Sequence, residues 1–151
     1  MISRRFARWR ELPTRDRWRL LGLALLLPLI SVQLRLFGYV RTLRWLERTS
    51  GRATARIANL DQQQAAEHLV RLAAIAGRHG AITATCLRQA LLIYWLLRRS
   101  GLTPSLRIGV RRQVSGIDAH AWVELQGVAL GQIELAHFPF PGSNQTALAL
   151  R

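Results

Sequence analysis

The sequence contains a single cysteine, Cys86, and no lysine among its 151 residues. One thiol cannot form an internal disulfide, so oxidative cross-linking plays no part in the fold, and a reducing, cytoplasmic location is expected. Acidic residues are also few: eight Asp and Glu against 22 arginines give a formal net charge of +14. A charge of this size favours polyanions as partners, namely nucleic acid, anionic lipid or an acidic polypeptide.

Sequence-specific nucleic-acid binding is not supported by any motif. The chain has no zinc-binding Cys/His spacing, no aromatic RNA-binding strand and no recognisable helix-turn-helix. His68 and His79 have no partner at coordinating spacing, so we expect surface or capping roles for them, with no metal and no cofactor. We therefore expect no nucleic-acid partner. Part of the charge excess is a basic N-terminal arm, residues 1–19, which holds seven arginines.

A bilayer-spanning helix is the weaker interpretation of the N-terminal apolar run, because the run reaches spanning length only if Gln33 and Arg35 are buried with it. Leu20–Val32 is followed by Gln33 and Arg35, whereas a spanning helix needs about 20 apolar residues and Arg costs about 2.5–3.5 kcal/mol at the bilayer centre. No small-x-small cleavage site follows, which argues against a signal peptide. We expect two helices, broken at Pro28 and packed on the domain or a partner. The alternative is contact of residues 1–40 with the inner face of the membrane.

The next segment, residues 32–48, has the periodicity of an amphipathic helix. Ser50-Gly51 is expected to end this helix and open a polar connector. The residues expected on its apolar face are Val32, Leu36, Val40, Leu43 and Leu46.

Two further helices are predicted in the middle of the chain. The first covers residues 61–77, with Asp61 as its N-cap. The second, residues 85–100, shows the clearest periodicity and can be capped by Thr85. The expected apolar positions are Leu69, Leu72, Ala73 and Ala76 in the first, and Leu87, Ala90, Leu91, Tyr94 and Leu97 in the second.

Beyond Pro104 the apolar period changes from helical to alternating, which indicates strands. Strands are predicted at residues 106–111, 119–124 and 128–135, forming a small antiparallel sheet. The tail, residues 138–151, is expected to be irregular. Helices followed by strands are typical of an α+β fold.

Cys86 and His120 are the candidate catalytic pair. Cys86 falls in the first turn of a predicted helix, where the helix dipole and unpaired N–H groups favour a thiolate. Its own backbone N–H could stabilise an oxyanion. His120 lies 34 residues later at the start of an alternating strand, where it could accept the thiol proton. The alternative interpretation is a buried cysteine and an unrelated half-buried histidine.

A third residue should orient the imidazole from the next strand. A three-residue loop at Leu125-Gln126-Gly127 would place Gln132 opposite His120 and Glu134 diagonally across. A two-residue turn would instead place Ile133 opposite His120. Gln132 and Glu134 are therefore the candidates, one neutral and one charged.

Several segments together resemble the leader peptidase of lasso-peptide biosynthesis, a transglutaminase-like branch of the papain-type cysteine proteases. The similarity covers about residues 83–140. It rests on Cys-Leu-Arg-Gln-Ala-Leu from Cys86, Leu-Leu-Arg-Arg-Ser-Gly-Leu ending at Leu102, the Leu-Arg-Ile-Gly-Val strand, and Ala-His-Ala-Trp-Val-Glu around His120. The resemblance implies a papain/transglutaminase-like fold, with a nucleophile helix packed on a small sheet.

The same resemblance implies an endopeptidase that removes the leader from a ribosomally made precursor peptide. Cys86 would be the nucleophile and His120 the base. The family has Asp twelve positions after the His, where this chain has Gln132; a neutral amide can still accept the imidazole N–H bond. The implied partners are the precursor, a small leader-binding protein and a separate ATP-dependent lasso cyclase.

The chain is thus divided into a basic arm (residues 1–19), a hydrophobic and amphipathic helical segment (20–50) and a peptidase domain (51–151). Two alternatives remain open. An acyltransferase on the same scaffold would pass the acyl group to an amine, and a catalytically impaired module would only bind peptide.

Overall fold

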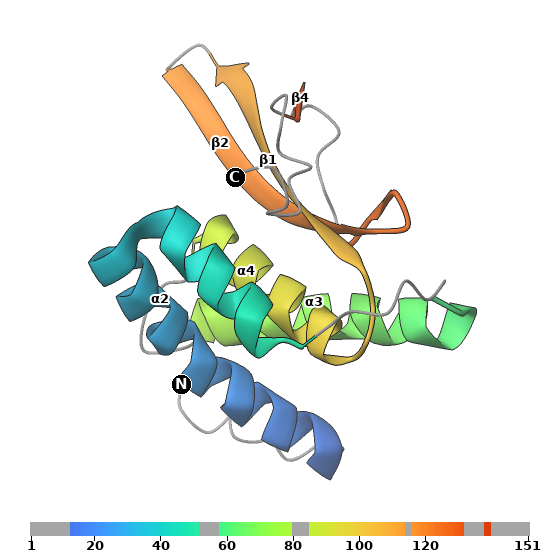
Figure 1. Cartoon of the computed structure of the whole chain (residues 1–151). Coiled ribbons are helices and arrows are strands. Elements are labelled where there is room, and N and C mark those ends of the chain that lie inside the picture. The colour runs from blue at the N-terminus through green and yellow to red at the C-terminus, as the bar shows by residue number, and fades with distance from the viewer. Residues whose placement is uncertain (1–12, 52–57, 80–84, 114–115, 132–137, 140–151) are drawn as a thin grey trace, which may run out of the picture.

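The computed structural model of the chain describes residues 13–51, 58–79, 85–113, 116–131 and 138–139. In this part of the protein, three helices form one layer and a four-stranded antiparallel sheet forms the other (Figure 1). Helices precede strands along the chain. The expected α+β class is confirmed.

Helix α2 (Thr14–Thr49) consists of two arms that meet at Gly38. Gly38 has φ 72° and ψ 176°, a conformation that glycine adopts without steric cost. The predicted break at Pro28 is wrong, because the helix continues through that residue. Leu27 and Ile30, on either side of Pro28, are each only 2% exposed, so packing holds the helix together where the proline removes a backbone hydrogen bond. The expected boundary at residue 19 falls within α2.

The apolar face predicted for residues 32–48 is only partly right. Leu43 and Leu46 are buried, but Val32, Leu36 and Val40 are 51%, 67% and 48% exposed. The prediction assumed one continuous helix across this range. The bend at Gly38 changes the direction of the chain, so residues before and after it do not share one face. The helix ends at Thr49, just before Ser50-Gly51, as predicted.

Helix α3 (Leu60–His79) begins one residue before the predicted N-cap. The cap is Asn59 and not Asp61: the Gln62 N–H donates to Asn59 Oδ1 at 2.8 Å, and the Asn59 N–H donates to Gln62 Oε1 at 3.1 Å. This reciprocal pair is a capping box. Of the residues expected on its apolar face, Leu72, Ala73 and Ala76 are buried and Leu69 is partly buried.

Helix α4 (Cys86–Arg99) agrees with the prediction and forms the centre of the molecule. It contacts α2, α3 and the two long strands. Its buried residues lie on several sides: Ala90, Leu91, Leu92, Ile93, Tyr94 and Leu97. The predicted apolar face of α4 is therefore buried, except at Leu87, which is partly buried. Buried residues also extend further around the helix than the periodicity indicated.

The C-terminal half of α4 is tied to the end of α2 by side-chain hydrogen bonds. The Tyr94 hydroxyl donates to Glu47 at 3.1 Å, Trp95 Nε1 to the Thr49 hydroxyl at 3.1 Å, and Arg98 Nε to the Ser50 hydroxyl at 3.0 Å. Burial raises the pKa of Tyr94 to about 12; the Arg98 charge opposes the shift and the Glu47 carboxylate adds to it. This end of α4 is fixed by polar contacts as well as by packing.

The sheet consists of β1 (Pro104–Gln113), β2 (Gly116–Leu125), β3 (Val128–Ala129) and β4 (Phe138–Pro139), in the order β3-β2-β1-β4. Strands β1 and β2 contain the two strands predicted first. Leu106 pairs with Val123, and these two side chains are buried in the core that contains α4. Strand β4 pairs with β1 at Gly109 and Val110, so the tail is not irregular throughout as expected.

The turn between β2 and β3 has two residues, and the predicted three-residue loop is wrong. Gln126 and Gly127 have φ values of 55° and 78°, and Leu125 pairs directly with Val128. Positive φ at both central positions is typical of a type I′ turn, whose twist matches that of the flanking strands. The prediction assigned the left-handed conformation to Gly127 alone.

The strand predicted at residues 128–135 is also shorter than expected, since β3 ends at Ala129. Gly131 has φ 84°, and its N–H donates to a carboxylate oxygen of Glu67 on α3 at 3.1 Å. A Cβ at position 131 would lie 2.9 Å from Val70 Cγ1. Only glycine fits here. The Leu130 N–H still donates to the Val123 oxygen at 2.9 Å, and the chain then contacts α3 through Gly131.

Candidate active site

Cys86 is the first residue of α4 and is half-buried. Thr85 occupies the N-cap position with extended φ and ψ of −69° and 159°, but its side chain makes no capping hydrogen bond. The Thr85 hydroxyl therefore does not accept a hydrogen bond from the first turn of α4, and the N–H groups of that turn can bind other acceptors. A helix N-terminus with this geometry favours negative charge, whether on a thiolate or on an oxyanion.

The thiol lies against the strand that carries His120. Cys86 Sγ is 3.8 Å from the backbone oxygen of Ala119, the residue directly before His120. Residues 86 and 120 come from different layers, and packing of α4 on β2 brings these layers together. The structure thus places the two candidate residues at one end of the α4–β2 contact.

His120 packs against Trp122 on the same strand. The two rings are stacked, with centroids 6.1 Å apart and planes at 17°. Side chains two residues apart on a strand share a face, and Trp122 is only 7% exposed. The indole therefore provides a fixed surface for one side of the imidazole.

Glu124 fixes the indole in turn. Trp122 Nε1 donates to Glu124 Oε1 at 3.1 Å, and Arg107 Nε on β1 donates to Glu124 Oε2 at 2.8 Å. The Arg107 and Glu124 side chains are 21% and 16% exposed, so solvent screens this ion pair less than one at the surface. His120, Trp122 and Glu124 share a face because they alternate along β2, but Arg107 was not identified from the sequence. Its signal was its alternating position in the first predicted strand, because Arg107 pairs with Trp122 in the sheet.

The His120 face of the sheet is opposite to the one that packs on α4. Ala121 and Val123 alternate with His120 and Trp122 and lie in the helical core. Strand β3 pairs with β2 only at Glu124 and Leu125, the last two residues of β2. Within the described chain, no strand therefore lies beside Ala119 and His120 on the β3 side of β2. Cys86 approaches β2 there.

The two candidates for the third position, Gln132 and Glu134, lie outside the described residues. The register of the two-residue turn, continued without interruption, would place Ile133 opposite His120. Gly131 interrupts it, because its positive φ and its bond to Glu67 turn the chain after β3.

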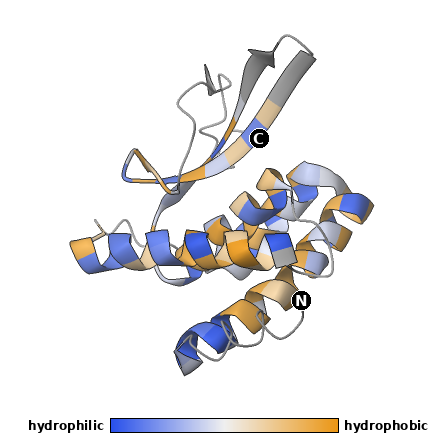
Figure 2. Cartoon of the chain, turned by 180° about the vertical axis from the view of Figure 1, so that it is seen from behind, coloured by the Kyte–Doolittle hydropathy of each residue, from blue (hydrophilic) through white to orange (hydrophobic). Residues whose placement is uncertain are grey.

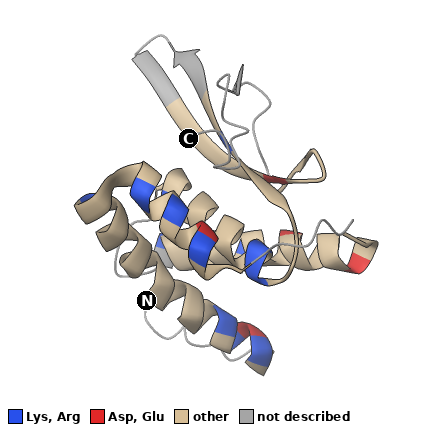
Figure 3. Ribbon diagram, in the orientation of Figure 1, with Lys and Arg blue, Asp and Glu red and all other residues tan. Residues whose placement is uncertain are grey.

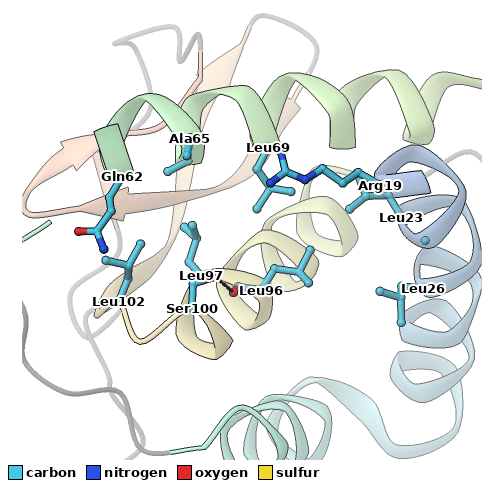
Figure 4. Close-up of a pocket in the computed structure, with 12 residues that line it drawn as sticks. Arg19, Leu23, Leu26, Gln62, Ala65, Leu69, Leu96, Leu97, Ser100 and Leu102 are labelled. Carbon is cyan, nitrogen blue, oxygen red and sulfur yellow. Dashed lines mark hydrogen bonds between the residues drawn. The ribbon is translucent and has the colours of Figure 1, made fainter. Parts of the chain in front are cut away.

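A pocket of about 360 Å³ lies between α2, α3 and α4, away from Cys86 (Figure 4). Leu96 and Leu97 line it, and these residues are in the C-terminal half of α4. Arg19 from α2 and Gln62 from α3 supply polar groups at its wall (Figure 4). Ten residues of α4, at about 1.5 Å each, separate Leu96 from the thiol. This pocket is not part of the candidate active site.

Among the described residues, no group of three or more His, Cys, Asp and Glu side chains could hold a metal ion. His68 contacts Asp16, with Nε2 3.0 Å from Oδ2. Asp16 is 8% exposed, so this pair joins the start of α2 to α3. The His79 side chain lies outside the described part of the chain.

Comparison with known families gives one match, over most of the chain. A family model described as the transglutaminase-like superfamily matches residues 25–138. No curated protein and no solved structure gives a match. The matched range contains α3, α4, strands β1 to β3, and both Cys86 and His120, and it ends at the first residue of β4. It begins within the first arm of α2, so the family similarity includes part of the hydrophobic segment.

Proposed function

Because the chain belongs to the transglutaminase-like superfamily, we propose that it is a cysteine endopeptidase that removes the leader from a ribosomally made lasso-peptide precursor. Cys86 is the nucleophile and His120 the general base. The observation that carries this proposal is the position of Cys86, at the first residue of α4 with its thiol 3.8 Å from the backbone of the His120 strand. The superfamily includes both cysteine proteases and acyltransferases.

The reaction follows from the chemistry of a thiol and an imidazole. His120 accepts the thiol proton, and the thiolate attacks the carbonyl carbon of the scissile peptide bond. The Cys86 backbone N–H donates to the resulting oxyanion. The imidazolium then gives its proton to the departing amine as the C–N bond breaks, which leaves the leader bound as a thioester. Water, deprotonated by His120, attacks this thioester and releases the leader carboxylate.

Proton transfer requires an imidazole nitrogen within about 3.2 Å of the sulfur, although such contacts are often longer before substrate binds. The thiol already lies 3.8 Å from the backbone oxygen of Ala119, the residue directly before His120, which supports this approach. Stacking on Trp122 limits the orientations of the ring. Trp122, Glu124 and Arg107 are therefore proposed as positioning residues.

The third residue of the site is proposed to be Gln132, with Glu134 as the alternative. Either side chain would accept the second imidazole N–H and hold the ring in one tautomer. Comparison of Gln132→Ala with Glu134→Ala distinguishes the two. A loss of kcat in one variant identifies the orienting residue, whereas wild-type rates in both reduce the triad to a Cys-His dyad.

The proposed partners are the precursor peptide, a small leader-binding protein that delivers it, and an ATP-dependent cyclase that receives the core. The proposed location is the cytoplasm, where the single thiol stays reduced. The partial exposure of Cys86 supports its use as a nucleophile, since the residue is half-buried and not enclosed in the core.

The deciding experiment incubates the full chain with a lasso precursor and its leader-binding protein, followed by mass spectrometry. We expect loss of the leader mass with wild type and none with Cys86→Ala. Cleavage that persists in Cys86→Ala would contradict the mechanism. An acyl product on an added amine, with no free leader acid, would instead identify an acyltransferase. A precursor left intact by the wild-type protein would contradict the endopeptidase proposal.

A further inference from the structure

The first arm of α2 has a continuous apolar stripe on its exposed side. Its members are separated by three or four residues, which places them on one face of a helix. They are Trp18, Leu21, Leu25, Leu29, Val32 and Leu36, with exposed fractions of 73%, 43%, 75%, 45%, 51% and 67%. We call this set the α2 stripe. It extends from Trp18 to Leu36, which is about 27 Å along the helix axis.

The opposite side of the same arm is buried. Leu20, Leu23, Leu27 and Ile30 are each at most 5% exposed and belong to the core. The arm is therefore apolar on two sides, and Figure 2 shows hydrophobic residues along most of its length. A helix of an isolated water-soluble domain has one apolar face. The second face needs a separate physical cause.

Charged residues lie only at the ends of the arm. Arg15, Arg17 and Arg19 are near its start, together with the buried Asp16 that contacts His68. Arg35 is near its end, while residues 20–34 carry no charge (Figure 3). At 100° per residue, Arg17 and Arg35 both lie about 80° from Leu25, on the same border of the stripe. An apolar stripe bordered by arginines is the pattern of a helix that lies in a membrane surface.

We propose that the α2 stripe inserts into the surface of an anionic lipid bilayer. The charge of +14 complements such a surface, and the arginines beside the stripe lie where lipid phosphates would be. An anionic bilayer accounts both for the arginines beside the stripe and for the length of the stripe. A protein partner would have to combine an apolar groove of this length with acidic groups beside it, whereas an anionic bilayer supplies both.

The arm lies on the membrane and does not cross it. By length and composition, α2 could span a bilayer. Spanning, however, would expose the buried leucines to lipid and break the contacts of α2 with α3 and α4. Insertion of the stripe alone leaves these contacts intact. The sheet lies on the other side of α3 and α4 from this arm (Figure 1), so the candidate active site faces away from the lipid.

The test measures sedimentation of the full chain with vesicles. We expect binding to vesicles of equal parts phosphatidylcholine and phosphatidylglycerol, and at least about tenfold weaker binding to pure phosphatidylcholine. The combined variant Leu21→Gln, Leu25→Gln and Leu29→Gln should weaken binding to the anionic vesicles by more than about tenfold. Leu60→Gln is the matched control. Leu60 is 77% exposed but lies on α3, so its variant should bind like wild type.

Two measurements distinguish surface docking from loss of folding and from a spanning helix. Circular dichroism of the combined variant should show an unchanged helix content and melting temperature, because the three leucines are on the exposed side. Alkaline carbonate should release the wild-type protein from vesicles; retention until detergent is added would overturn surface docking in favour of a spanning helix.

Failure of the wild type to bind either vesicle, or equal binding of the combined variant, would overturn the proposal. Self-association lost in the combined variant without vesicle binding would assign the stripe to a second copy of the chain.

Discussion

The two ends of α4 are held in different ways. At the C-terminal end, three side-chain hydrogen bonds join Tyr94, Trp95 and Arg98 to the last turn of α2 and Ser50. The N-terminal end has no capping bond from Thr85, and the Cys86 thiol makes a long contact with a backbone oxygen. One helix thus combines a fixed end that supports the fold with an N-terminal turn whose backbone donors are not engaged by the cap.

This difference between the two ends of α4 indicates which end contributes to stability and which end can take part in catalysis. Polar contacts at the C-terminal end lower the free energy of the folded state, but they leave no group free to react. A nucleophile needs the reverse, namely an accessible sulfur near donors that are not already used. Substitutions at the two ends should therefore separate activity from stability.

The largest expected effect is at the N-terminal end. Cys86→Ala should lower the rate of leader removal by at least about a thousandfold, because the covalent step is lost. The melting temperature should change little, since Cys86 is half-buried and its contact with Ala119 is long. Peptide cleavage assays and calorimetry on the same preparation provide the measurement. A large loss of stability would mean that the thiol supports the fold.

Leucine truncation compares the packing of the two ends. Leu97 is 4% exposed and lies in the C-terminal half, whereas Leu87 near Cys86 is only partly buried. Leu97→Ala should lower the free energy of unfolding by about 2–4 kcal/mol, and Leu87→Ala by less than about 2 kcal/mol. Urea denaturation measures both. Equal losses would show that the N-terminal end is as tightly packed as the other.

Alkaline pH should weaken the C-terminal end selectively. The folded pKa of Tyr94 is about 12, against about 10 when unfolded, so the unfolded state loses its proton first. The resulting stability, on the order of 2 kcal/mol, is present below pH 10 and is lost as pH rises through about 12. The chain has no lysine, and Tyr39 is the other tyrosine.

Tyr94→Phe tests this assignment. The variant should be less stable by about 1 kcal/mol at neutral pH, because the bond to Glu47 is lost. It should show a smaller further loss between pH 10 and 12, where Tyr39, whose pKa burial also raises, remains. Urea denaturation at several pH values measures the slope. An unchanged slope in Tyr94→Phe would exclude Tyr94 as its source.

The smallest effect is expected from adding a cap at the N-terminal end. Thr85→Asp should stabilise the protein by about 0.5–1 kcal/mol, because aspartate accepts N–H bonds of the first turn and complements the helix dipole. The same charge opposes a thiolate at Cys86, so cleavage should slow by a few fold. Thr85→Asn provides a cap without the charge. Equal rates in the two variants would rule out an electrostatic cause.

Local patterns predicted the elements that depend on neighbouring residues. The limits of α4 and the alternation of β1 and β2 follow from periodicity and turn residues. The continuity of α2 through Pro28 could not be predicted from local patterns. It depends on the burial of Leu27 and Ile30, which is a property of the tertiary structure. The β2–β3 turn was missed because a non-glycine residue, Gln126, adopts a positive φ.

The candidate site was predictable as a pair of residues but not as a geometry. A cysteine at a helix start and a histidine on a strand can be recognised from spacing. The contact between Cys86 and Ala119 depends on how α4 packs on the sheet, over 33 positions in sequence. Similarly, the bond from Gly131 to Glu67 crosses 64 positions, and no local pattern indicates that β3 ends there.

The α2 stripe also has a consequence for the colloidal behaviour of the purified protein. Mutual repulsion between molecules of charge +14 keeps the exposed leucines of neighbouring copies apart at low ionic strength. Added salt shortens the range of this repulsion to about 10 Å at 0.1 M, while the attraction between apolar surfaces persists. Solubility without lipid should therefore fall as salt is raised. Dilute buffer or a mild detergent is the appropriate condition for concentrating the protein.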